Sequence, residues 1–171
     1  MERRKALKGI AFLAAGSAIL PYCKSDVTAI KYNNLPELNS NDHKLIQQLS
    51  LAIIPVKGTE MAPPMPSDKF ILMSVNDCYS PEDQVKFMKG LSEFTVLANK
   101  KGEDFGSLTS ADQQSLFESA INDQSSEDLK MFAKTTKDLT LRNVTTSQIF
   151  MEKYRAFKML PGTYVACKSI S

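Results

Sequence analysis

Few side chains of this sequence could do chemistry: it holds three cysteines and a single histidine. Covalent haem attachment needs a Cys-x-x-Cys-His motif, and His43 is far in the sequence from Cys23, Cys78 and Cys167. A lone histidine without a paired nucleophile or a second ligand supports little catalysis. We therefore interpret His43, near the start of a predicted helix, as a surface or capping residue, and we expect no catalytic residue and no metal site in this chain.

Paired carboxylates could act as a general acid and base, but only where burial shifts their pKa values apart. The pairs present here fall at or near predicted helix starts, where the helix dipole already accounts for them: Glu82-Asp83, Glu103-Asp104 and Glu127-Asp128. A dinucleotide or flavin site needs clustered glycines, because only glycine lets the backbone approach a pyrophosphate. The seven glycines form no such cluster. The sequence thus predicts no bound cofactor.

The first residues have the layout of an export signal. Residues 1–8, MERRKALK, are basic, and residues 9–20, GIAFLAAGSAIL, are apolar. A permanent membrane helix takes about 20 apolar residues, so this stretch is too short to span a bilayer. The alternative interpretation of these residues is a buried N-terminal helix.

The basic part resembles the twin-arginine type of export signal. Arg3, Arg4, Leu7 and Lys8 match that pattern, while Ala6 stands where Phe is commonest. The general secretion signal is the alternative. The twin-arginine route carries folded cargo, so a chain that uses it can bring a folded partner with it. We expect residues 1–22 to be the export signal and the protein to lie in the periplasm or on the outer face of the cell envelope.

Cys23 follows this segment directly and is a candidate lipidation site. A lipoprotein signal favours a small residue before the cysteine, whereas Tyr22 is bulky, and Gly16-Ser17-Ala18 is an alternative cleavage site. A lipid on Cys23 would attach the chain to a membrane without spanning it.

The remaining two cysteines are a candidate disulfide. Thiols of exported proteins oxidise, and when Cys23 is lipidated or removed, Cys78 and Cys167 remain as a pair. A bridge between them would close a loop of about 90 residues, which the chain-entropy model credits with roughly 4 to 5 kcal/mol. The alternative is that Cys78 and Cys167 are two unrelated buried cysteines.

The charge of the chain argues against a nucleic-acid partner. The formal net charge is +2, but the first 22 residues hold four of the 21 basic and one of the 19 acidic residues. The rest of the chain therefore carries a formal charge of −1. Binding to phosphates needs a dense basic face, ideally with aromatic residues between the charges, and no such pattern is present.

Helical periodicity dominates after residue 39. Apolar residues recur at three- and four-residue spacing, and hydroxyl residues stand where helices would begin. The first predicted helix starts with Ser40 as its cap, carries its apolar face on Leu45, Ile46, Leu49, Ala52 and Ile53, and ends before Pro55. Further helices are predicted to start near Ser80, Thr109, Ser125 and Thr146, with an irregular loop over residues 56–66 and a short apolar segment from Ser67 to Cys78.

Together these patterns predict an all-α protein, an irregular bundle of about five helices after the signal segment. Its apolar fraction of 43% and charged fraction of 23% are those of a globular domain. We expect three parts: the signal at residues 1–22, a polar linker at 23–39 and a helical domain at 40–171. Gly90, inside the second helix, is expected to permit a close contact with a neighbouring helix.

Several ordered segments of residues 43–167 resemble the gluconate 2-dehydrogenase subunit 3 family. The segments are Leu49–Pro55, Asn76–Pro81, Phe87–Leu91, the stretch around Phe105, and Pro161–Tyr164 followed by Cys167. The twin-arginine-like signal is similar to that of the family as well.

This resemblance implies a non-catalytic accessory subunit. Members of the family accompany a large flavoprotein that oxidises a sugar or sugar acid, and often a cytochrome c subunit, so FAD and haem are expected in the partner subunits. Membrane association would come through the partner or a lipid, and Pro161, Gly162 and Tyr164 are candidates for the partner contact. Plain helix termination is the other interpretation of that turn, and a free-standing envelope lipoprotein without a dehydrogenase partner is the alternative function.

Overall fold

The computed structural model of the chain describes residues 31–100 and 104–157. From Tyr32 onward these residues belong to one compact unit, and the described ranges hold six α-helices and one short 3-10 helix but no strand. The prediction of an all-α protein is confirmed. In chain order the elements are α2 (Ser40–Ile53), α3 (Ser67–Cys78), α4 (Pro81–Lys100), the 3-10 helix η1 (Phe105–Ser107), α5 (Ser110–Ile121), α6 (Glu127–Thr145) and α7 (Gln148–Tyr154).

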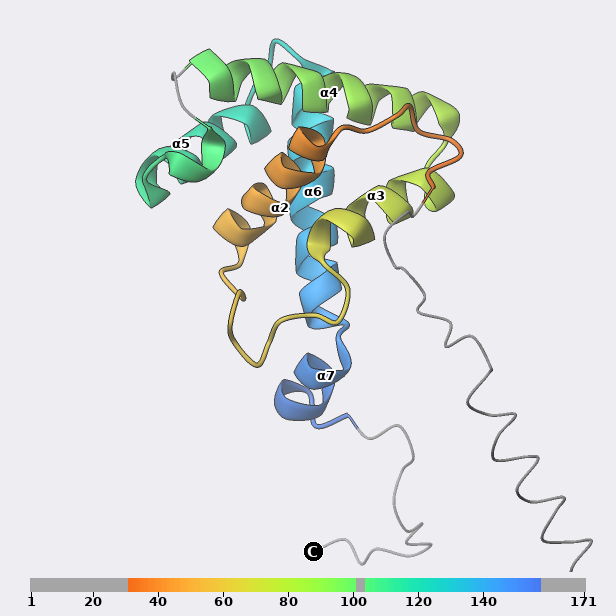
Figure 1. Cartoon of the computed structure of the whole chain (residues 1–171), viewed down its shortest axis with the longest axis vertical. Helices are drawn as coiled ribbons and strands as arrows, with labels where there is room; N and C mark the ends of the chain where they lie inside the picture. Colours follow the sequence, from red (N-terminus) through yellow and green to blue (C-terminus); the bar gives the residue numbers. More distant parts are fainter. Residues whose placement is uncertain (1–30, 101–103, 158–171) are drawn as a thin grey trace, which may run out of the picture. The chain divides into compact units, whose positions relative to one another are not determined.

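Helix α6 is the element on which the other helices pack. It contacts α4 most extensively, and it also meets α2, α3, α5 and α7. In Figure 1, α4 crosses one end of α6 and α7 follows the other end. Buried residues recur along α6 from Leu129 to Val144, which is why one helix can serve several neighbours.

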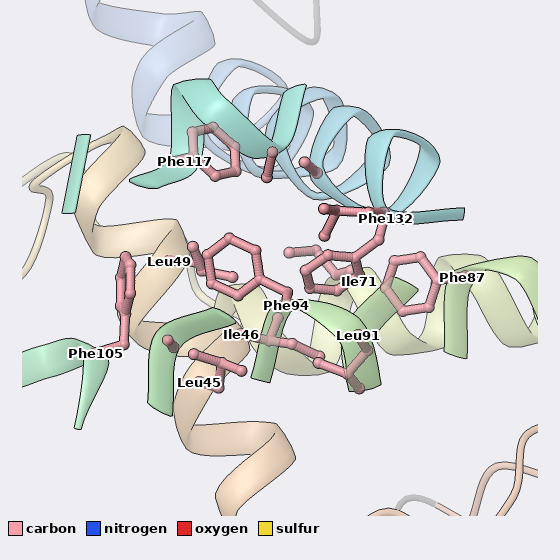
Figure 2. Packing of buried hydrophobic residues seen from close by; sticks show 14 of the residues in the cluster. Leu45, Ile46, Leu49, Ile71, Phe87, Leu91, Phe94, Phe105, Phe117 and Phe132 are labelled. Atoms are coloured by element: carbon pink, nitrogen blue, oxygen red, sulfur yellow. The ribbon is translucent and has the colours of Figure 1, made fainter. Parts of the chain in front are cut away.

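The core is built around four fully or almost fully buried phenylalanines from three different elements. Phe87 and Phe94 of α4 both contact Phe132 of α6, with ring centroids 5.1 and 5.8 Å apart, and Phe94 meets Phe105 of η1 at 5.7 Å. Figure 2 shows these rings among leucine and isoleucine side chains of α2, α3 and α4. Tilted and edge-on ring pairs of this kind add to the stabilisation from burial.

Gly90 marks the closest approach of α4 to α6, as its place in the sequence predicts. A Cβ atom added at Gly90 would lie 2.2 Å from the backbone oxygen of Asp128 and 2.6 Å from the Cβ of Phe132. Only a residue without a side chain fits there.

Side-chain caps fix most of the helix starts. Thr109, Ser126 and Ser147 each accept a hydrogen bond from the backbone amide three residues on, at the starts of α5, α6 and α7. Ser80 does the same for Asp83 at the start of α4, where Pro81 is the first helical residue. These starts were predicted within one or two residues.

The cap of α2 is Asn39 and not Ser40. The Asn39 side chain accepts hydrogen bonds from the amides of Asn41 (2.8 Å) and Asp42 (2.9 Å), and Asp42 accepts one from the Asn39 amide in return. This reciprocal pair is a capping box, which satisfies donors that the first turn leaves unpaired.

Replacing Asn39 by alanine should lower the free energy of unfolding by about 1 kcal/mol, because two amides lose their acceptor. Denaturant titration measures the change. Asn41→Ala is the matched control, because Asn41 is exposed and lies one position inside the helix. This change should leave the free energy of unfolding within a few tenths of a kcal/mol of the native value. Equal losses in the two variants would contradict the assignment of Asn39 as the cap.

Two other details of the first half differ from the prediction. Ala52 is exposed, and the inner face of α2 instead includes Ser50, whose hydroxyl donates to the Ile46 carbonyl and accepts from Thr140 of α6. The apolar segment after Ser67 is a full helix, α3, so residues 31–100 and 104–157 hold six helices where about five were expected. The loop at residues 56–66 is irregular, as predicted.

The end of the predicted linker is part of the folded unit. Asn34 donates its backbone and side-chain N–H groups to the side-chain and backbone oxygens of Asn76, both at 2.9 Å. Leu35 is buried and belongs to the core. Residues 32–39 therefore lie against α3 and α4.

Candidate functional site

Helix α7 differs from the other helices because none of its side chains is buried. Its start is well formed, since Ser147 caps it through the amide of Phe150. Its sequence is nevertheless rich in large apolar residues, and a helix of seven residues is marginal in water unless an apolar face is covered. Figure 1 shows α7 beyond the end of α6, which is the helix it contacts.

We call the apolar side chains of this region the α7 surface: Ile149, Phe150, Tyr154 and Phe157. Tyr154 is 61% exposed and Phe157 is 50% exposed. The rings of Phe150 and Tyr154 lie against one another, with centroids 5.1 Å apart. Large aromatic side chains that contact solvent in a group mark interaction sites, where they contribute more to binding than other residue types.

The turn after α7 fixes the position of Phe157. Ala156 has a φ of +48°, the left-handed conformation that glycine favours, and the amide of Phe157 donates to the Met151 carbonyl at 3.0 Å. The backbone therefore folds back onto the last turn of the helix. This holds the Phe157 side chain beside α7 in a defined place.

The loop at residues 56–66 connects this region to a small apolar pocket. Glu60 in the loop forms an ion pair with Lys153 of α7, which lowers the pKa of the Glu60 carboxyl group and raises that of Lys153. The pocket has a volume of about 210 Å³ and lies between the loop, the end of α2 and the end of α6. Its apolar lining comes mainly from Leu51, Ile54, Val56, three prolines of the loop and Val144.

Polar contacts keep this pocket in shape. The Asn143 side-chain amide of α6 donates to the Met65 carbonyl at 3.1 Å and to the Ser67 hydroxyl at 3.2 Å, which holds the end of the loop on α6. At its floor, Thr140 donates to Ser50 at 3.2 Å. The α7 surface and the pocket thus both adjoin α6 and the 56–66 loop.

His43 does not cap α2, and its side chain is 31% exposed, so it lies partly at the surface as expected. Its Nδ1 lies 3.0 Å from Oδ2 of Asp68, a buried residue of α3, and its ring lies 6.0 Å from that of Tyr32. Burial and the negative charge of Asp68 raise the pKa of the Tyr32 phenol. The pair joins α2 to α3 and to the segment before α2, which is a structural role.

The described residues contain no group of three or more histidine, cysteine, aspartate or glutamate side chains that could hold a metal ion. Within the same ranges, no helix has the length and apolar character needed to cross a bilayer.

Most of the sequence-predicted site residues lie outside the described residues. These are Arg3, Arg4, Leu7 and Lys8 of the signal, the lipidation candidate Cys23, the contact candidates Pro161, Gly162 and Tyr164, and Cys167. Cys78 is described: it is the last residue of α3 and is exposed. Its pairing with Cys167 stays a prediction.

The α7 surface was missed by sequence reasoning, although the helix itself was predicted. The available signal was the density of large apolar residues at 149–157, which exceeds what a seven-residue helix can direct toward one neighbour.

Comparisons with known proteins give one match. The family model described as gluconate 2-dehydrogenase subunit 3 matches residues 40–162, which covers every helix described above. A comparison with curated proteins and one with solved structures found no match. The matched range is well over half of the chain, and on this basis the chain belongs to the gluconate 2-dehydrogenase subunit 3 family.

Proposed function

We propose that this chain is the non-catalytic small subunit of an exported flavin-dependent dehydrogenase complex that oxidises a sugar or sugar acid. The family match over residues 40–162 carries the proposal. The helical domain agrees with the proposal, because in such a complex the small subunit would only have to bind the catalytic subunit. FAD, and haem where a cytochrome c subunit is present, would be held by the partner subunits.

The contact with the catalytic subunit would be made through the α7 surface. Its exposed aromatic residues can enter pockets of a partner with little loss of side-chain freedom, since tyrosine and phenylalanine have few rotatable bonds. The predicted contact residues Pro161, Gly162 and Tyr164 follow this surface in the sequence and would extend it. Because α6 and the 56–66 loop hold α7, the partner would meet a surface that is already formed.

The complex would form before export. The twin-arginine-like residues Arg3, Arg4, Leu7 and Lys8 would then serve both subunits, because that route moves folded proteins. At the envelope, the partner or a lipid on Cys23 would hold the complex at the membrane. The small subunit would in this way aid the export, maturation and membrane association of the catalytic one.

The test is recovery of the dehydrogenase with the tagged small subunit. We expect the purified material to show flavin absorbance and to reduce a dye acceptor with gluconate or glucose. Replacing Tyr154 and Phe157 together by aspartate should lower this recovered activity at least tenfold, roughly the effect of losing two aromatic anchors. Neither side chain is buried, so the free energy of unfolding should change by no more than about 0.5 kcal/mol.

Val96→Asp is the matched control for this experiment. Val96 is a large apolar residue of similar exposure on α4, so the substitution introduces an aspartate away from the α7 surface. The control should retain the recovered activity. Preparations of the native chain without flavin and without dye reduction would reject the subunit proposal and leave the free-standing lipoprotein as the function.

A further inference from the structure

The outer side of α4 is partly apolar: Val85 and Val96 are exposed, and Met88 between them is partly buried against the core. With 3.6 residues per turn, Val85, Met88, Ser92 and Val96 lie within an arc of about 80° on this helix. We call these four residues the α4 face. Val85 is 53% exposed and Val96 is 56% exposed, whereas the opposite side of α4 holds Phe87 and Phe94 in the core.

Two hollows meet on this face at its central residue. The first, about 310 Å³, is lined by Leu35, Pro36, Val85 and Met88, and the second, about 360 Å³, is lined by Val96, Leu97 and Leu129. Ser92 lines both. The Ser92 side chain is small, and its hydroxyl already has a hydrogen-bond partner because it donates to the Met88 carbonyl. A helix laid along α4 could approach most closely at Ser92.

One edge of the α4 face carries charges of alternating sign. Helical periodicity brings Glu82, Lys89, Glu93 and Lys100 to this edge, and all four contact solvent at least in part. Read from the start of α4, the signs are negative, positive, negative, positive. When a second α4 helix runs in the opposite direction and is centred on Ser92, each charge of the first helix therefore lies near a charge of opposite sign on the second.

We propose that the α4 face binds a second copy of this chain, with the two α4 helices antiparallel and Ser92 on the two-fold axis. In this arrangement Met88 of one copy packs against Val96 of the other. Lys89 lies within about 3 Å, along the helix axis, of Glu93 of the second copy, and Glu82 lies equally near Lys100 of the second copy. Each charge of the edge then finds an opposite charge, and the symmetry repeats every contact.

The first test places a cysteine on the two-fold axis. In the Ser92→Cys variant, mild oxidation should join two chains through residue 92, and a peptide map identifies this bond separately from any bond of the native cysteines. Lys137→Cys, at an exposed position of α6, is the control and should give at least tenfold less 137–137 product. Equal yields of the two products would overturn the proposal.

The second test measures self-association of the purified chain by sedimentation. We expect a dimer with a dissociation constant in about the micromolar range, as befits a small interface. Val96→Asp should raise that constant at least tenfold, since two valines lose their burial. Glu82→Lys and Lys100→Glu should each raise it about tenfold by placing like charges together, and the variant with both changes should return close to the native value.

A chain that stays monomeric at all concentrations, or a charge exchange that does not restore the dimer, overturns the α4 proposal. These outcomes are distinct from failure of the dehydrogenase proposal. Val96→Asp separates the two surfaces, because it should weaken self-association at least tenfold and retain the recovered dehydrogenase activity.

Discussion

Replacing Gly90 by valine is expected to abolish the folded state of the helical domain. The first atom of any side chain at this position would lie 2.2 Å from the Asp128 backbone oxygen and 2.6 Å from the Cβ of Phe132. Neither obstacle is the end of a flexible side chain, so α4 and α6 would have to separate. These two helices form the most extensive contact of the fold, and Phe87, Phe94 and Phe132 pack across it.

Gly90→Ala gives the quantitative form of this prediction. Helix propensity alone would make alanine more stable than glycine by about 1 kcal/mol. Overpacking of a tight helix contact costs typically about 1 to 3 kcal/mol and occasionally more, and the backbone clash at Gly90 belongs at the upper end. We therefore expect a net decrease of about 2 kcal/mol in the free energy of unfolding, measured by denaturant titration followed by circular dichroism.

Ser92→Ala is the matched control for Gly90. It lies on the exposed side of the same helix, where an alanine meets no backbone, and it should leave the free energy of unfolding the same or slightly higher. A Gly90→Ala protein more stable than the native chain would contradict this prediction. It would show that the gain in helix propensity exceeds the cost of overpacking, and that α4 and α6 are not in such close contact.

The features that sequence reasoning predicted well are those decided within a few residues. A cap at Thr109 or Ser80 depends on one hydroxyl and on amides three positions away, so the local sequence contains the whole interaction. The inner face of α6 follows from spacing alone. The Ser40 error is of the same kind: Asn39 and Ser40 are both capping residues, and only the reciprocal bond to Asp42 decides between them.

Interactions between distant residues account for what was missed. Helix α3 lacks a side-chain cap, since it starts after Pro66, and its apolar run is too short for periodicity to separate a helix from a strand. The segment at residues 32–39 is fixed by Asn34 and Asn76, which are 42 positions apart. His43 and Asp68 are 25 positions apart. No local pattern contains such a pair.

The α7 surface was missed for a different reason. A pattern of apolar residues predicts that a helix has a face to cover, but it does not say which molecule covers it. In α6 the neighbours belong to the same chain; in α7 the side chains remain in solvent. Both helices were predicted, and only the structure shows that no side chain of α7 is buried.

The fold agrees with the proposed function because the fixed segment at residues 32–39 and the exposed α7 surface are two separate parts of the domain. Residues 32–39 lie against α3 and α4 and begin the folded unit. The α7 surface lies near the end of the described residues and contacts solvent. Under the proposed function, a signal at one end and a partner surface at the other could act at the same time.

The proposed function predicts that replacing Arg3 and Arg4 by lysine keeps both the small subunit and its dehydrogenase partner in the cytoplasm. The change preserves the charge of the signal, so a general secretion signal would tolerate it, whereas the twin-arginine route requires the paired guanidinium groups. Dye-reducing dehydrogenase activity in the periplasmic and membrane fractions should fall at least about tenfold, because Lys does not substitute for Arg at such a site.

Glu2→Gln is the control for this experiment, because it changes the charge of the same segment and leaves Arg3 and Arg4 in place. It should leave the envelope activity unchanged. Two other results are informative. Normal export of both proteins in the lysine variant would show that the chain uses the general secretion route. Retention of the small subunit with normal export of the dehydrogenase would show that the two proteins travel separately, and the shared export proposed for this subunit would then be wrong.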